Sequence, residues 1–141
     1  MVEKRYLLDS DVLIAMLRDR KDISGIRRKI LNVGIDRCCC SAVSVAELSS
    51  GAYRMGTERG LFEVSFIQGI MTVVPFGSKD SQDADIFGKT KALLMGAGTP
   101  VDDMDLLIAS TALANDLTLV THNIRHFSKV PGLKIEDWLN S

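Results

Sequence analysis

The feature that most constrains this fold is an alternation: short apolar runs are separated by segments of helical periodicity. The apolar runs, at residues 5–8, 38–43, 71–76, 117–120 and 133–135, have the length of buried strands. Strands that are joined through helices pair in parallel, because a parallel pair needs a long crossover connection. The sequence therefore predicts an α/β fold of three layers, α/β/α, with a mostly parallel sheet of four to five strands and helices on both faces.

Six helices are predicted between these runs. They lie at residues 11–18, 23–33, 44–55, 58–70, 80–95 and 103–114. The first follows Ser10 and Asp11, either of which can cap it. The third begins at Ser44, which forms the pattern of a capping box with Glu47 three residues later.

Length and composition match an ordinary globular domain. The 141 residues suit one domain, predicted to span residues 1–141, and 46% hydrophobic with 25% charged residues argue against disorder. With 17 basic and 18 acidic residues the net charge is −1, so no overall positive field attracts nucleic acid or a membrane surface. Aromatic residues, at 6%, are too sparse for a platform that stacks bases. Any polyanionic partner would therefore need a local basic patch.

The cysteines and the length of the apolar runs bear on location. Cys38, Cys39 and Cys40 are adjacent, which matches neither a zinc site nor a disulfide framework. No apolar run approaches the roughly 18 residues of a membrane-spanning helix, and the first five residues do not resemble a signal peptide. We expect a cytoplasmic protein with no membrane segment.

Acidic residues follow the predicted strands, at the edge where open parallel sheets bind ligands. Asp9 ends the first run, Glu47 lies one helical turn after the second, and Asp105 lies in the first turn of the sixth helix. Two carboxylates about 4 Å apart repel by roughly 4 kcal/mol at an effective dielectric near 20. A hard divalent cation would neutralise such a group, and the lack of histidine and cysteine ligands favours Mg²⁺ or Mn²⁺ over zinc.

Each acid also has a purely structural explanation. Asp9 can end a strand or begin a turn, and Asp11 can cap a helix. Asp102, Asp103 and Asp105 suit the cap and first turn of a helix, where they complement the helix dipole. Single residues therefore leave the choice open between a metal site and local structure.

Whole phrases, taken in order, are more specific. They are YLLDSDVLI (6–14), SVAEL (44–48), DMDLLIA (103–109) and LVTHNIRHF (119–127), followed by VPGL (130–133) and EDW (136–138). In this order and spacing the chain resembles the PIN-domain ribonucleases, specifically the VapC-like toxins of type II toxin–antitoxin pairs. The resemblance extends over nearly the whole chain and implies a single PIN-like domain.

The resemblance implies an endoribonuclease that depends on Mg²⁺, for which Mn²⁺ can substitute. By position, Asp9, Glu47 and Asp105 are its catalytic acids and metal ligands. Relatives often have a fourth acid where this chain has Asn123, whose amide adds no charge, and Asp103 could supply that charge. Glu47 or Asp103 would accept the proton of the attacking water.

Further residues are expected to support the site or to bind RNA. Those expected to orient the carboxylates or the nearby backbone are Ser10, Asp11, Asp103, Thr121 and Asn123. Those expected to contact RNA phosphates are Arg125, Arg54 and Lys89.

The resemblance also implies partners. It implies a cognate antitoxin that blocks the site, a homodimer, and an RNA substrate for which transfer RNA is the family-level expectation. Apolar residues within 23–33 and 61–70 are candidate contact surfaces.

Two other functions stay open from the sequence. Asp9-Ser10-Asp11 fits the aspartyl nucleophile of a haloacid-dehalogenase-type phosphatase, although the strand ending in Thr121 follows the acidic pair 102–103, whereas that family would place it first. A catalytically silent PIN-like module that binds a partner is the other alternative.

Overall fold

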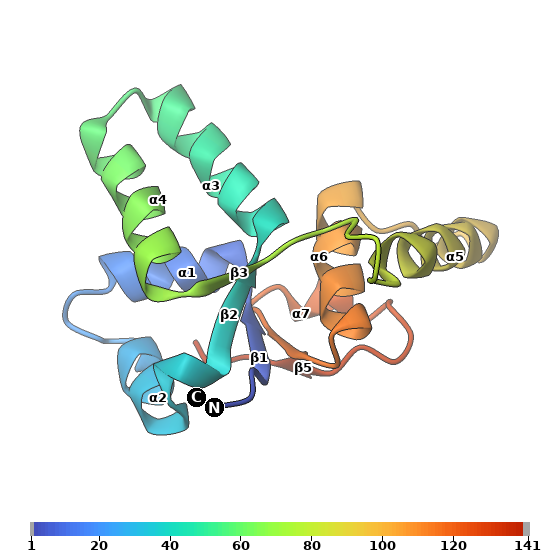
Figure 1. Ribbon diagram of the computed structural model, residues 1–141, viewed down its shortest axis with the longest axis horizontal. Helices are drawn as coiled ribbons and strands as arrows, with labels where there is room; N and C mark the ends of the chain where they lie inside the picture. The colour runs from blue at the N-terminus through green and yellow to red at the C-terminus, as the bar shows by residue number, and fades with distance from the viewer. Residues whose placement is uncertain (1, 140–141) are drawn as a thin grey trace.

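Five parallel strands form the centre of the computed structural model, which describes residues 2–139. The strands are β1 (Tyr6–Leu8), β2 (Cys38–Ser41), β3 (Thr72–Val74), β4 (Thr118–Val120) and β5 (Ile135–Glu136). The helices are α1 (Ser10–Arg18), α2 (Ile26–Val33), α3 (Ala42–Met55), α4 (Glu58–Ile70), α5 (Asp83–Gly96), α6 (Asp103–Ala114) and α7 (Ile124–Phe127), with a 3-10 turn at Ile35–Arg37. The predicted α/β architecture is confirmed (Figure 1).

The strand order β3-β2-β1-β4-β5 locates the ligand-binding edge. The chain runs outward from β1 through β2 to β3, and then returns to place β4 on the other side of β1. In the register of the central pair, Tyr6 lies opposite Thr118 and Leu8 opposite Val120. The order reverses between β1 and β4, and sheets of this kind open a crevice at the carboxyl ends of such a pair.

Two hydrophobic cores lie on opposite faces of the sheet. Alternate residues of β1 point to opposite faces, so Leu8 joins the core beneath α1, α2 and α4, whereas Leu7 joins the core beneath α5 and α6. Cys39 likewise enters the second core while its two neighbours enter the first. All three cysteines are buried and unpaired, and they act as small apolar residues.

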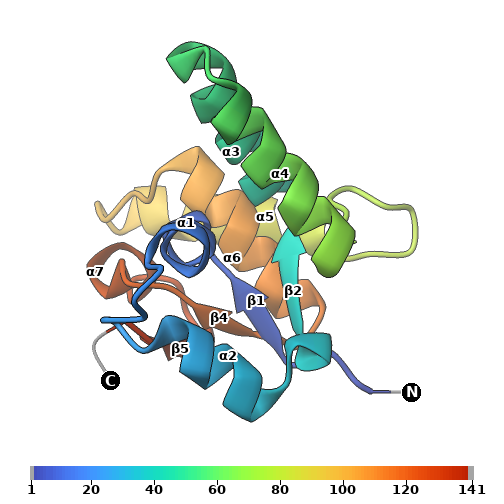
Figure 2. The same cartoon turned by 90° about the vertical axis from the view of Figure 1, so that its left-hand side faces the viewer.

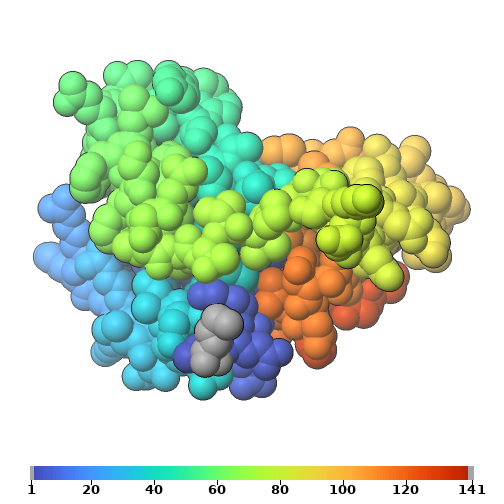
Figure 3. All heavy atoms as spheres, viewed as in Figure 1, coloured from blue at the N-terminus to red at the C-terminus, as the bar shows by residue number. Residues whose placement is uncertain are grey.

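The helices are divided between the two faces. Figure 2 shows α1 and α2 in front of the sheet, with α5 and α6 behind it. Helices α3 and α4 form an antiparallel hairpin that projects beyond the sheet, and the space-filling view in Figure 3 shows it rising above the rest of the surface. No helix in residues 2–139 is long and apolar enough to cross a membrane.

The helix caps differ from those that the sequence suggested. Helix α1 is capped by Asp9, whose carboxylate accepts from the backbone N–H of Ser10, so the expected caps at positions 10 and 11 are wrong. Helix α3 is capped by Ser41, which accepts from the backbone N–H of Ser44. The expected capping box at Ser44 is therefore wrong as well, and Glu47 is left available for another contact.

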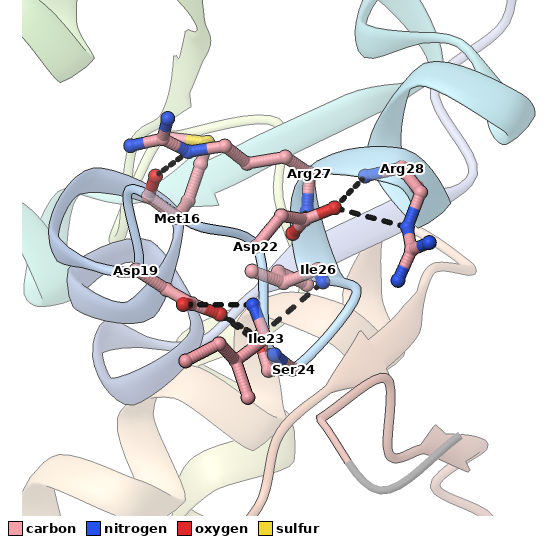
Figure 4. Close-up of polar contacts among 8 residues, drawn as sticks. All are labelled: Met16, Asp19, Asp22, Ile23, Ser24, Ile26, Arg27 and Arg28. Carbon is pink, nitrogen blue, oxygen red and sulfur yellow. Dashed lines mark hydrogen bonds and ion pairs between the residues drawn. The ribbon is translucent and has the colours of Figure 1, made fainter.

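Helix α2 begins later than predicted because polar side chains organise the loop before it (Figure 4). Asp19 accepts from the backbone N–H groups of Ile23 and Ser24, and Asp22 accepts from that of Arg27. The guanidinium of Arg27 donates to the carbonyl of Met16, which ties α2 to the end of α1. Ile23, which the periodicity placed in the helix, lies in this loop and is exposed.

The α3–α4 hairpin supplies a test of the packing. A Cβ at Gly60 would lie 2.9 Å from Cβ of Ala52, whereas a Cβ at Gly69, also in α4, would meet nothing within 4 Å. We expect Gly60→Ala to lower the free energy of unfolding by about 1–3 kcal/mol through overpacking. The matched variant Gly69→Ala should raise it by about 0.5–1 kcal/mol, because alanine favours the helix. Urea unfolding measures both, and effects of the same sign would contradict this packing.

Candidate active site

Asp9 lies at the carboxyl ends of β1 and β4, in the crevice that the strand order predicts. Its backbone N–H donates to the carbonyl of Val120, which extends the pairing of the two strands by one residue. One carboxylate oxygen accepts from the backbone N–H of Ser10 at 2.8 Å, and the other accepts from the hydroxyl of Thr121 at 2.9 Å. The side chain is therefore oriented from both strand ends, and the residue is only 7% exposed.

Glu47 reaches the same place from α3. The hydroxyl of Ser10 donates to Oε1 of Glu47 at 2.9 Å. Because α3 starts at Ala42, directly after β2, Glu47 falls about one and a half turns into the helix, above the strand ends. Ser10 thus contacts both Asp9 and Glu47, residues that are far apart in the sequence.

Asp105 and Asp11 complete the acidic group. Asp105 lies in the first turn of α6, and one of its oxygens is 3.5 Å from Nδ1 of His126 on α7. Asp11 accepts from the backbone N–H of Val12 and from that of His122, so it connects α1 to the loop that follows β4. We name Asp9, Asp11, Glu47 and Asp105 the acidic group.

The electrostatics of the acidic group oppose its ionisation. Burial and the nearby charge of Asp11 raise the pKa of Asp9 to about 7, against the hydrogen bonds from Ser10 and Thr121. Burial also raises the pKa of Asp11, of Glu47 and of Asp105, and the charge of a neighbouring carboxylate adds to each shift. Among residues 2–139, no lysine or arginine is a main cause of these shifts.

The donor set of the acidic group fits a hard divalent cation. Its side chains offer only carboxylate oxygens, which Mg²⁺ and Mn²⁺ prefer, and a cation would relieve the repulsion that raises their pKa values. In the part of the chain that the structure describes, no three histidine, cysteine, aspartate or glutamate side chains are arranged to hold a metal ion. Asp9, Glu47 and Asp105 each have a protein partner, and because an ionised carboxylate has about four lone-pair sites, these contacts leave lone pairs that could bind an ion.

Two other predicted site residues make different contacts. Asp103 forms an ion pair with Lys91 at 2.9 Å and is largely exposed. The side-chain amide of Asn123 contacts Nδ1 of His126, and its backbone N–H donates to the hydroxyl of Thr121. Asn123 therefore lies beside Thr121 and His126, each of which contacts a member of the acidic group.

The predicted basic residues lie on three different helices. Arg125 is exposed on α7, directly after the loop that borders the acidic group. Arg54 is exposed in the last turn of α3. Lys89 lies on α5 and pairs with Asp85 at 3.1 Å.

Three residues outside the predicted set of site residues also act near the site. His126 contacts Asp105, and Asp137, near the end of the described chain, contacts Nδ1 of His122 at 3.0 Å. The charge of Asp102, expected only as a helix cap, acts on both Glu47 and Asp105. No spacing in the sequence relates positions 122 and 137 to the acidic group, because the contacts depend on the sheet order.

Comparison with known proteins gives consistent matches. The PIN domain model matches residues 6–133. A Salmonella typhimurium protein named tRNA(fMet)-specific endonuclease VapC is 32% identical over 95% of this chain and 98% of its own length. Ribonuclease VapC2 of Haemophilus influenzae is 29% identical, over 96% of this chain and 98% of its own.

Solved structures agree with these matches. The structure of DNA-bound VapBC from Salmonella typhimurium contains a chain that superposes with a TM-score of 0.84 at 32% identity, covering 96% of this chain and 98% of that one. VapBC-1 from nontypeable Haemophilus influenzae gives a TM-score of 0.77 at 26% identity, covering 94% and 97%.

The raised pKa of Asp9 predicts a pH-dependent gain in stability for Asp9→Asn. In the unfolded chain Asp9 ionises near its ordinary pKa of 3.8, whereas in the folded protein it ionises near 7. As the pH rises from about 4 to about 7, ionisation therefore favours the unfolded state, by up to about 4 kcal/mol. In the absence of divalent ions, Asp9→Asn should be more stable relative to wild type at pH 8 than at pH 5.

Urea unfolding with a chelator present measures this difference. Asp80→Asn, on an exposed loop, is the matched control for the loss of a carboxylate at the surface. A stability difference between wild type and Asp9→Asn that does not change with pH would contradict the burial of Asp9 among like charges.

Proposed function

The chain belongs to the PIN-domain family, and from that premise we propose that it is an endoribonuclease toxin of a toxin–antitoxin pair that uses Mg²⁺ or Mn²⁺. The observation that carries the proposal is the acidic group, gathered at the point where the strand order reverses. The names of the relatives, which are ribonucleases and a tRNA endonuclease, support RNA as the substrate. The pairing of VapC with VapB in the similar structures supports an antitoxin partner.

Asp9, Glu47 and Asp105 would hold the metal ion. When bound, the ion supplies positive charge for the phosphate group and lowers the pKa of an attacking water. Thr121 and Ser10 fix the direction of the carboxylates through their hydroxyl groups. Glu47 is better placed than Asp103 to accept a proton, because Asp103 is engaged by Lys91.

The basic residues indicate how RNA would approach. Arg125 lies on α7, which begins directly after the Thr121–Asn123 loop, and in residues 2–139 it has no acidic partner. We assign it a contact with an RNA phosphate. Lys89, in contrast, lies on α5 and is paired with Asp85. Because its charge already has a partner, it is the least supported of the three predicted RNA contacts.

A groove away from the acidic group suits the protein partner. It has a volume of about 550 Å³ and lies between α1, α2 and α4. Its exposed apolar residues include Leu31, Phe62 and Phe66, of which Leu31 is 75% exposed. These residues fall within the two predicted contact segments, 23–33 and 61–70. We place antitoxin binding in this groove, because a large exposed apolar patch marks a protein interface.

The narrower features also remain proposals. We propose a transfer RNA substrate, as the name of the Salmonella relative suggests, a homodimer, and action in the cytoplasm. The phosphatase alternative loses its basis, because the family is established and the chain places Thr121 after the acidic pair, in the order that argues against it. A silent binding module is the second candidate, favoured by the neutral Asn123 and by the lack of a preformed ion site in residues 2–139.

Cleavage of total RNA tests the proposed function. Wild type should cleave with Mg²⁺ or Mn²⁺ and not with a chelator. Asp9→Asn and Asp105→Asn should each lower the rate by about 10²–10³-fold, because each removes a charge that holds the ion, worth several kcal/mol of transition-state stabilisation. Asp80→Asn is the control and should cleave as wild type does. Metal-dependent cleavage that survives in both site variants would overturn the assignment.

A further inference from the structure

A second, smaller pocket adjoins the acidic group. It has a volume of about 240 Å³ and lies between α1 and the α3–α4 hairpin. Ser10 and Glu47, which hydrogen-bond to each other, form its end nearest the site. Glu47 belongs to the acidic group and Ser10 hydrogen-bonds to it, so RNA bound at the acidic group would lie close to this pocket.

The walls of the pocket are mostly apolar. Ile14 and Leu17 come from α1, and Leu48 comes from α3. Gly51 lies one turn of α3 beyond Glu47 and lines the pocket with its backbone alone. A Cβ at this position would meet no atom within 4 Å. The missing side chain thus leaves open space. A pocket of this kind, apolar with a few polar groups at its ends, is typical of a small-ligand site, and its volume suits a fragment smaller than a drug molecule.

Positive charge lies at the end away from the site. Arg54 lines the pocket, is exposed, and has no acidic partner in residues 2–139. Arg18, nearby on α1, is neutralised by Glu63 at 2.9 Å. At a rise of 1.5 Å per residue, Arg54 lies about 10 Å along α3 from Glu47.

We propose that this pocket is a subsite for one unpaired nucleotide of the RNA, next to the bond that is cleaved. The base lies against Ile14, Leu48 and the backbone of Gly51. The RNA backbone continues from this nucleotide toward Arg54, which binds a phosphate. Proteins read RNA sequence mainly through unstacked bases held in such pockets, so the subsite selects the nucleotide beside the cut. This inference rests on the proposed function.

Filling the pocket tests the proposal without disturbing the protein. Gly51→Leu places a side chain in the open space, and leucine favours the helix more than glycine does. We expect KM to rise about tenfold with kcat within about twofold, because only binding is lost. Sequencing of cleavage ends in total RNA should show a changed nucleotide preference beside the cut. Gly51→Ala, which fills less space, should show a smaller change in the same direction.

Gly69→Leu is the matched control, since this glycine is also helical, is open to solvent and lines neither the pocket nor the site. It should cleave as wild type does. Arg54→Gln should weaken RNA binding and reduce the slope of log affinity against log salt by about one.

The outcomes distinguish a failure of the subsite from a failure of the proposed function. Metal-dependent cleavage by wild type, together with the same KM and the same cut sites in Gly51→Leu, would overturn the subsite alone. Absence of metal-dependent cleavage by wild type would overturn the proposed function itself. Thermal unfolding of each variant shows whether it is folded, and Gly51→Leu should unfold at or above the wild-type temperature.

Discussion

The electrostatic conflict within the acidic group is the constraint on which the rest of the site depends. Asp9 is buried at the ends of β1 and β4, where the charges of Asp11 and Asp105 act on it, and the charge of Asp105 also acts on Glu47. The nearby hydroxyl and backbone N–H groups orient these carboxylates, but they do not neutralise them. A protein that holds such a group must tolerate protonation or recruit a cation. In a PIN-domain chain, that requirement is the physical basis on which we propose metal-dependent cleavage of RNA.

The parallel sheet is what brings these carboxylates close together. A parallel sheet directs every strand end to one edge, and the reversal of strand order between β1 and β4 opens a crevice there. The two cores on either face, with Leu7 and Leu8 alternating between them, fix β1 rigidly enough to keep Asp9 in place. The α3–α4 hairpin then brings Glu47 over the same edge and leaves a pocket along its inner side. The stability of the packed layers therefore offsets the strain of gathering like charges.

Much of this could be predicted from the sequence. The short apolar runs predicted the strands, and the acids that follow them predicted Asp9, Glu47 and Asp105 at one edge of the sheet. The catalytic and metal-binding roles of these three residues stay predictions. The predicted capping box of α3 was wrong, because Ser41 caps this helix instead of Ser44. Glu47 accepts a hydrogen bond from Ser10, a tertiary contact that local capping rules do not describe. The late start of α2 depends on a loop organised by Asp19 and Asp22, which periodicity does not describe. Contacts such as His122 with Asp137 depend on sheet order, and the pocket beside Gly51 depends on how α1 packs against the hairpin.

Calorimetric titration of the metal-free protein with Mn²⁺ tests the central claim most directly. Because a ligand carboxylate must lose its proton before it binds the ion, and Asp9 has a pKa near 7, affinity should be about tenfold higher at pH 8 than at pH 6. Titrations at pH 6 in buffers of different ionisation enthalpy should show release of protons, and Asp9→Asn should abolish that release. Absence of Mn²⁺ binding, or binding with no proton release and no dependence on pH, would contradict the account and favour a silent binding module.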